Sequence, residues 1–327
     1  MRKNLSSIIL ILLFSIVCVA LYFYLPSSIK TLDTKISQSS PVVLSEERLN
    51  LIKDYGDLLA KGLPESNPQL YFYWWSSQKK ISDLRIKRAI GEIKNTTVKN
   101  KEIKVWSFLN MGVVIKTDKH TLAFDTANLP FSLAHDELIN LVDIFLVSHG
   151  DGDHFDPILL KKVLKQNKKV VTLKGFFSSI LNSPNAVSLT SGETVDISGV
   201  KITAFQTDHR GDGNFNEPNA WFLVEVDGFK ILHTGDGRDF KDKSEQEKVY
   251  AMKDIDILLG NILLHPYNIR DLKPKVFIPL HLYKFMSGGD LYRESRIEKV
   301  LETHNQYAKD LKTSKIIYLL PGESILL

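Results

Sequence analysis

The chain has little cysteine and no concentrated charge. Cys18 is the one cysteine among its 327 residues. An intrachain disulfide and a cysteine-based zinc site are therefore excluded, so any metal must be held by histidines and carboxylates. The net charge is only +4, with 42 basic and 38 acidic residues scattered along the chain. No nucleic-acid partner is expected, because such proteins present a concentrated basic face. The oligomeric state is left open.

One long apolar run lies at the amino terminus. Residues 8–25 are uncharged and follow Arg2 and Lys3. A helix over this run would nearly cross a hydrocarbon core of about 30 Å. We therefore expect residues 1–26 to form a transmembrane anchor, with a cleaved signal segment and secretion as the alternative. Positive charge before the run predicts a membrane-anchored protein whose main domain is extracytoplasmic.

Residues 27–103 are expected to be a tether and a helical, aromatic extension. The tether covers the polar residues 27–41. After Ser45, which can cap a helix, apolar residues recur at helical spacing. The run "QLYFYWWSSQ" is strongly aromatic. We interpret it as core packing, and a wall that faces substrate or membrane is the alternative.

Residues 104–327 read as one α/β domain. Short β-like runs such as "GVVIKT", "DIFLVS" and "KVFIPLH" alternate with helical stretches such as "DPILLKKVLKQN". Asp227 and Gly228 stand between two apolar runs, which indicates a hairpin. This order predicts sheets covered by helices.

Histidines and carboxylates gather where the expected strands end. The stretch "LVSHGDGDHFD" follows one apolar run, and three single residues follow three others: His209, Asp236 and His281. Ligands commonly lie on such loops. Clustered imidazoles and carboxylates are costly unless a cation compensates them. The pattern therefore predicts a metal centre.

The spacing within "LVSHGDGDHFD" allows two ions. Alternate residues of an extended segment point the same way, so His149 and Asp151 can share one ion. Asp153 and His154 lie on the following turn and can face a second ion.

The motifs resemble those of the metallo-β-lactamase superfamily, whose signature is H-x-H-x-D-H followed by separate His, Asp and His. The runs "GVVIKTDKHTLAFDT", "WFLVEVDGFKILHTGDG" and "PKVFIPLHLYKF" are similar to further family features. They look most like the branch containing L-ascorbate-6-phosphate lactonase and N-acyl-phosphatidylethanolamine phospholipase D. The resemblance implies a four-layer αββα fold, which we expect to follow the transmembrane helix and the short helical extension.

The resemblance also implies two divalent metal ions and a hydrolase. One ion would be held by His149, Asp151 and His209, and the other by Asp153, His154 and His281, with Asp236 bridging them. The implied reaction is hydrolysis of an ester-type bond (phosphodiester, lactone or lipid phosphoester) by a metal-bridging hydroxide. Asp153 and Asp236 would be the catalytic residues.

Asp151 departs from the family pattern, which has histidine there. Zinc is the first expectation, and manganese or iron are alternatives because carboxylate ligands favour harder ions. Two other functions stay open. One is a di-iron redox protein, since the related flavodiiron proteins use glutamate at this position. The other is a non-catalytic metal-binding module.

Four further residues are candidates for substrate binding. They stand close in sequence to expected ligands: His233, His265, Arg210 and Tyr283. The expected partner is a small-molecule or lipid ester. The lipid is favoured by the aromatic run and by membrane contact through residues 8–25.

Overall fold

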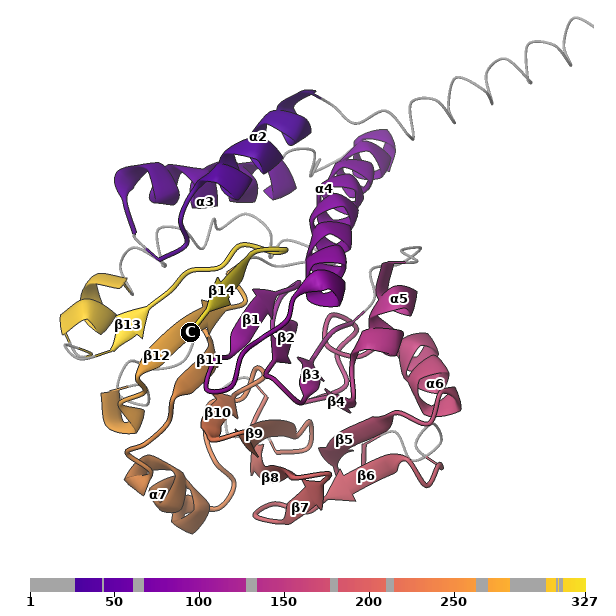
Figure 1. Ribbon diagram of the computed structural model, residues 1–327, viewed down its shortest axis with the longest axis vertical. Coiled ribbons are helices and arrows are strands. Elements are labelled where there is room, and N and C mark those ends of the chain that lie inside the picture. The colour runs from indigo at the N-terminus through magenta and orange to yellow at the C-terminus, as the bar shows by residue number, and fades with distance from the viewer. Residues whose placement is uncertain are drawn as a thin grey trace, which may run out of the picture.

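The computed structural model describes residues 27–42, 44–60, 68–127, 134–176, 182–209, 215–262, 270–282, 304–309, 311 and 314–327. Two seven-stranded sheets form its centre (Figure 1). The first sheet has the order β14-β1-β2-β3-β4-β5-β6 and the second β13-β12-β11-β10-β9-β8-β7.

The strands are short and largely buried. Those of the first sheet are β1 (Lys104–Ser107), β2 (Val113–Lys116), β3 (Thr121–Phe124), β4 (Ile144–Leu146), β5 (Lys169–Leu173), β6 (Ala186–Leu189) and β14 (Ser324–Leu326). Those of the second are β7 (Thr194–Ile197), β8 (Val200–Thr207), β9 (Asn219–Val226), β10 (Phe229–His233), β11 (Ile257–Asn261), β12 (Val276–Leu280) and β13 (Lys315–Ile316).

The two sheets pack face to face through one apolar core. Phe124 and Leu146 of the first sheet lie in the same buried cluster as Phe222 and Leu259 of the second. Strands covered on both faces carry continuous apolar runs rather than alternating ones. This explains the continuous apolar runs at residues 220–224 of β9 and 257–259 of β11.

Helices cover the outer faces of the sheets. The helices are α2 (Ser27–Gln38), α3 (Glu46–Ala60), α4 (Pro68–Asn95), α5 (Ala134–Leu141), α6 (Pro157–Lys165) and α7 (Lys243–Ala251). Ile90 of α4 and Leu160 of α6 pack with Phe145 of the first sheet. Ile52 of α3 and Val249 of α7 belong to the cluster that contains Phe277 of the second sheet. The layered α/β arrangement agrees with the expected one.

The predicted fold class needs one correction, which concerns the transmembrane helix. Among the residues that the structure describes, no helix combines the length and the hydropathy required to cross a bilayer. The longest, α4, has 28 residues but carries charged side chains such as Lys79, Lys80 and Arg85. The predicted anchor at residues 8–25 lies outside the described residues. The membrane-anchored location depended on that helix and is corrected with it.

The extension is more ordered than the sequence suggested. Residues 27–38, expected as a tether, form α2, because Ile29, Leu32 and Ile36 recur at helical spacing and are buried. The predicted cap of the next helix is confirmed: the Ser45 hydroxyl accepts a hydrogen bond from the Arg48 amide at 3.1 Å. The division of the chain at residues 26 and 103 stays a prediction.

Candidate metal centre

The predicted site residues converge on one edge of the two sheets. Strands β3 and β4 run parallel, as do β10, β11 and β12, so their carboxyl ends lie together. Loops from both sheets meet there, since the Ala220 amide at the start of β9 donates to the Ser148 carbonyl after β4 at 2.9 Å. The edge therefore draws side chains from distant parts of the chain into one place.

The first group of side chains contains His149, Asp151 and His209. Their nearest ligand atoms all lie within 4.8 Å of one another. Oδ2 of Asp151 is 3.4 Å from Nε2 of His209 and 3.9 Å from Nε2 of His149. Both imidazoles are buried, whereas the Asp151 side chain is 49% exposed. The group combines two buried imidazoles with one accessible carboxylate.

The second group contains Asp153, His154 and His281, with Asp236 beside them. Oδ2 of Asp153 lies 3.5 Å from Nε2 of His154 and 3.6 Å from Nε2 of His281. Oδ2 of Asp236 lies at the same two distances from the same two nitrogens. The two imidazoles and two carboxylates thus surround one small volume.

Local hydrogen bonds fix the loop that supplies four of these residues. The amides of His154 and Phe155 both donate to the Asp151 carbonyl, at 2.9 and 2.8 Å. Asp156 then caps α6 by accepting from the amides of Ile158 and Leu159. Such a cap is typical of a helix start. The loop is therefore held between β4 and α6.

Asp125 orients the ligand His154 from behind. This fully buried carboxylate follows β3, and its Oδ2 is 2.9 Å from Nδ1 of His154. It also accepts from the Ser148 amide at 2.7 Å and from the Ser148 hydroxyl at 2.5 Å. Fixing one ring nitrogen leaves the other, Nε2, directed at the site. Asp125 was not a predicted site residue, although its run was noted as a family feature.

A tight turn presents Asp236. The Asn219 side chain accepts from the Asp236 amide at 3.0 Å and donates to the Thr234 carbonyl at 2.9 Å. Gly235 has a φ of 51°, and a Cβ there would meet the side chains of Asn219 and Ser148. Only glycine fits this turn without displacing its neighbours.

Burial and charge divide the imidazoles into two kinds. Burial, followed by the nearby His154, lowers the pKa of His149 to about 3. His149 is therefore neutral and can offer a lone pair. Burial alone would lower the pKa of His154, but Asp236, Asp125 and Asp153 raise it well above its ordinary value. The surrounding carboxylates thus favour a positive charge at this position, which a bound metal ion would supply in place of a proton.

The two carboxylates of the second group are ionised. Burial opposes this, yet the nearby imidazoles of His154 and His281 lower the pKa of Asp153. The pKa of Asp236 is held well below its ordinary value by the same two imidazoles, against the effect of burial. Paired carboxylates that stay charged in a buried site require a compensating cation.

The donor set fits divalent metal ions. Nε2 of His149 and Nε2 of His154 are buried and, within the described part of the chain, accept or donate no hydrogen bond. A buried polar atom without a partner costs about 1–3 kcal/mol. Coordination to a metal would satisfy both nitrogens, and imidazole with carboxylate suits zinc, manganese or iron.

The predicted substrate-binding residues have different outcomes. His233 is fully buried, and its Nε2 is 3.0 Å from the Met111 carbonyl and 4.0 Å from Oδ2 of Asp125. Its ring stacks on Phe124, behind the ligand groups. Arg210, His265 and Tyr283 lie outside the described residues.

Two asparagines at the site were missed by the sequence reasoning. Nδ2 of Asn110 donates to Oδ2 of Asp153 at 2.6 Å. Nδ2 of Asn261 donates to Oδ1 of Asp236 at 2.7 Å. Asn110 lies between β1 and β2, and Asn261 ends β11. No motif marks either one, because a single amide in a turn or at a strand end is common.

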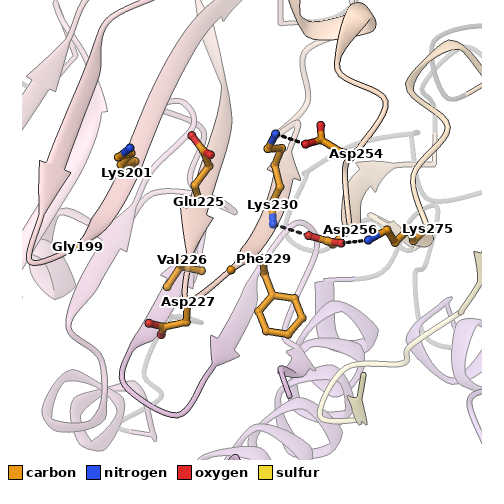
Figure 2. A pocket seen from close by; sticks show the side chains of 11 residues that line it. Gly199, Lys201, Glu225, Val226, Asp227, Phe229, Lys230, Asp254, Asp256 and Lys275 are labelled. Carbon is orange, nitrogen blue, oxygen red and sulfur yellow. Dashed lines mark hydrogen bonds and ion pairs between the residues drawn. The ribbon is translucent and has the colours of Figure 1, made fainter. Parts of the chain in front are cut away.

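A second hollow lies at the opposite edge of the second sheet, around the β9–β10 hairpin (Figure 2). Four of its charges form two ion pairs: Nζ of Lys230 is 2.6 Å from Asp254, and Nζ of Lys275 is 2.6 Å from Asp256. At the other edge, by contrast, histidines and carboxylates gather in groups that could hold a metal ion.

Comparison with known proteins relates the chain to metallo-hydrolases. Residues 103–281 match the family described as the beta-lactamase superfamily domain. A metal-dependent hydrolase of Thermococcus onnurineus is 29% identical over 151 residues, which are 42% of this chain and 66% of that protein.

Solved structures agree in fold. A metallo hydrolase of Ignicoccus hospitalis has a TM-score of 0.50 and 16% identity, covering 69% of this chain and 99% of its own. The diiron β-hydroxylase CmlA of Streptomyces venezuelae has a TM-score of 0.51 and 11% identity, covering 70% of this chain and 54% of its own.

Proposed function

Because the chain belongs to the metallo-β-lactamase superfamily, we propose that its seven clustered side chains form a dinuclear hydrolytic centre. The chain is a metal-dependent hydrolase, as its relatives are named. The proposal rests on one observation above all. Two buried imidazole nitrogens without a hydrogen-bond partner among the described residues face carboxylates from both sheets.

Each of the two groups of side chains would supply the ligands of one metal ion. His149, Asp151 and His209 would hold one ion, and Asp153, His154 and His281 would hold the other. Asp236 is assigned to the space between them, because it faces His154 and His281 and its charge also acts on His149. Zinc is the first candidate, and Asp151 keeps manganese and iron as alternatives.

The residues around the ions would orient the attacking water and the ligand side chains. Bound divalent ions lower the pKa of water and polarise the oxygen of the bond under attack. Asp153 remains ionised, and its side chain is 22% exposed. It can therefore accept a hydrogen bond from the attacking water and orient it. Asp125 holds the His154 ring in place through Nδ1.

The proposed substrate is a small molecule with an ester-type bond, a phosphodiester or a lactone. Both reactions develop negative charge on oxygen, which a cationic centre stabilises. The case for a lipid ester combined the membrane anchor with the aromatic run; because the anchor is corrected, the lipid is not carried forward. The similarity of this chain to the branch of the family that contains the lactonase and the phospholipase D stays a prediction.

The decisive experiment measures metal and turnover together. Elemental analysis of the purified chain should give about two equivalents of zinc or manganese. Asp236→Ala and His281→Asn should lower hydrolysis of a generic phosphodiester or lactone at least a hundredfold. Asparagine is chosen at position 281 because His281 has a φ of 59°, which asparagine tolerates. Full activity in a folded variant would contradict the proposal.

A di-iron redox protein is the second candidate. The observation that favours it is the carboxylate of Asp151 in the first group. Two equivalents of iron in the purified chain, with no hydrolysis by the zinc or manganese form, would favour this function over the hydrolase.

A further inference from the structure

Asn110 contacts two separate ligands of the second group. Its side-chain Nδ2 donates to Oδ2 of Asp153 at 2.6 Å. Its backbone carbonyl accepts from the amide of His281 at 3.0 Å. Asp153 comes from the first sheet and His281 from the second. One residue in the β1–β2 turn therefore holds the two halves of this group in register.

Asn261 makes a similar contact to Asp236, but to the oxygen that does not face the imidazoles. Its Nδ2 donates to Oδ1 of Asp236 at 2.7 Å, and its own amide donates to the Thr234 hydroxyl at 3.1 Å. With Oδ1 engaged, the other oxygen, Oδ2, is the one that faces His154 and His281. Both carboxylates of the group are thus fixed by a buried amide.

An amide is the appropriate donor for this task. An amide N–H fixes the direction of a carboxylate but carries no charge, so the carboxylate keeps its full charge for a metal. A lysine or arginine in the same place would neutralise it. Within the described residues, no Lys or Arg ion pair to Asp153 or Asp236 is formed.

The position of Asn110 lowers the local stability of the β1–β2 turn. It is 6% exposed, and its Oδ1 accepts no hydrogen bond from the described part of the chain. Its φ of 51° is left-handed, a conformation that asparagine adopts more readily than most residues. Strained and unsatisfied positions of this kind collect at functional sites.

We propose that Asn110 and Asn261 are positioning residues that set the metal affinity of the second group by orienting Asp153 and Asp236. The inference rests on the proposed dinuclear centre. Asn110 acts on ligands from both sheets. Its loss therefore weakens binding of the second ion and leaves binding of the first ion, at His149, Asp151 and His209, unchanged.

The test compares metal binding in four variants of the full chain. Asn110→Gly removes the amide yet allows the left-handed φ, and Asn110→Asp places a negative charge against Asp153. Asn261→Ala removes the second amide. Asn185→Ala is the matched control, because Asn185 donates from an exposed amide to Asn167, remote from the ligand groups. Zinc and manganese are titrated against a chromophoric chelator, and unfolding temperatures verify folding.

In Asn110→Gly and Asn261→Ala, the second equivalent should bind about 10–100-fold more weakly, the usual effect of losing a hydrogen bond to a ligand. The first equivalent and the control should match the parent chain. When cobalt(II) replaces zinc, the absorption band of the second bound equivalent should differ between these two variants and the parent chain. Two unchanged equivalents in both variants would overturn the inference. A parent chain that binds fewer than two metals would instead contradict the proposed function.

Discussion

Asp151 differs from the other clustered residues in its exposure and its chemistry. Its side chain is 49% exposed, whereas those of its neighbours His149 and His209 are 3% and 6% exposed. A carboxylate reachable by solvent can leave or rejoin an ion more easily than a packed imidazole. In the proposed centre, the first group is therefore where the choice of metal would be set.

Replacing Asp151 with histidine should shift this choice toward zinc. A neutral nitrogen donor in place of a hard oxygen should raise the preference for zinc over manganese roughly tenfold. Competition between the two ions, followed by elemental analysis, measures it. Asp151→Asn serves as a control that keeps an oxygen donor but removes the charge. An unchanged preference in Asp151→His would show that Asp151 is not a ligand.

Sequence reasoning at this scale succeeded where residues formed a pattern. The four residues of "LVSHGDGDHFD" and the three single residues after later strands lie together, because the sheet edge unites strand ends. Asn110 and Asn261 could not be predicted. Their significance depends on carboxylates that are far away in sequence.

The helical extension is fastened to the catalytic region by one buried ion pair and by buried hydrogen bonds. Arg48 of α3 donates to both Glu323 oxygens and to the Tyr318 carbonyl. Arg85 of α4 pairs with Asp33 of α2 at 2.8 Å and donates to the Pro321 carbonyl at 2.5 Å. Both arginines therefore clamp the segment 318–323.

Breaking the Arg48 pair should destabilise the whole fold. Arg48→Met leaves the Glu323 charge buried, which costs about 3–5 kcal/mol. The double variant Arg48→Met/Glu323→Gln should recover much of this loss, because no charge is left unpaired. Denaturant unfolding measures both. Lys94→Met, in an exposed pair with Glu137, is the control and should have little effect. Equal stability of all variants would show that the extension is not fastened in this way.

Elements were predictable where their pattern was strong. The hairpin at Asp227 and Gly228 is confirmed, with φ values of 47° and 87°. The sequence reading missed β6, β7 and β14, since these strands have only three or four residues each and only one of those residues, Leu189, is buried. It took α2 for a tether because polar residues surround its three buried apolar ones.

At the scale of the whole molecule, the centre joins the two sheets. His149, Asp151, Asp153 and His154 follow a strand of the first sheet, while His209, Asp236 and His281 follow strands of the second. An ion held between them would connect layers that otherwise meet through apolar packing. Metal binding should therefore contribute to the stability of the entire fold.

Metal removal should lower the unfolding temperature. Free metal at a hundred times its dissociation constant adds about 2.7 kcal/mol to the free energy of unfolding. Dialysis against a chelator should abolish this gain, and zinc or manganese should restore it. The double variant Asp151→Ala/His281→Asn, which lacks one ligand in each group, should respond far less. A parent chain whose unfolding temperature ignores added metal would contradict the prediction.

The pairing of β1 with β14 also determines when the molecule can finish folding. Lys104 aligns with Leu326, and the backbones of Ile103 and Leu327 exchange two hydrogen bonds. During synthesis, β1 must wait with one edge unpaired until residues 324–326 have left the ribosome. Pairings between residues so distant in sequence slow folding and prolong the time during which an aggregation-prone strand edge is unpaired. Newly made chains should accordingly depend on chaperones more than the finished protein does.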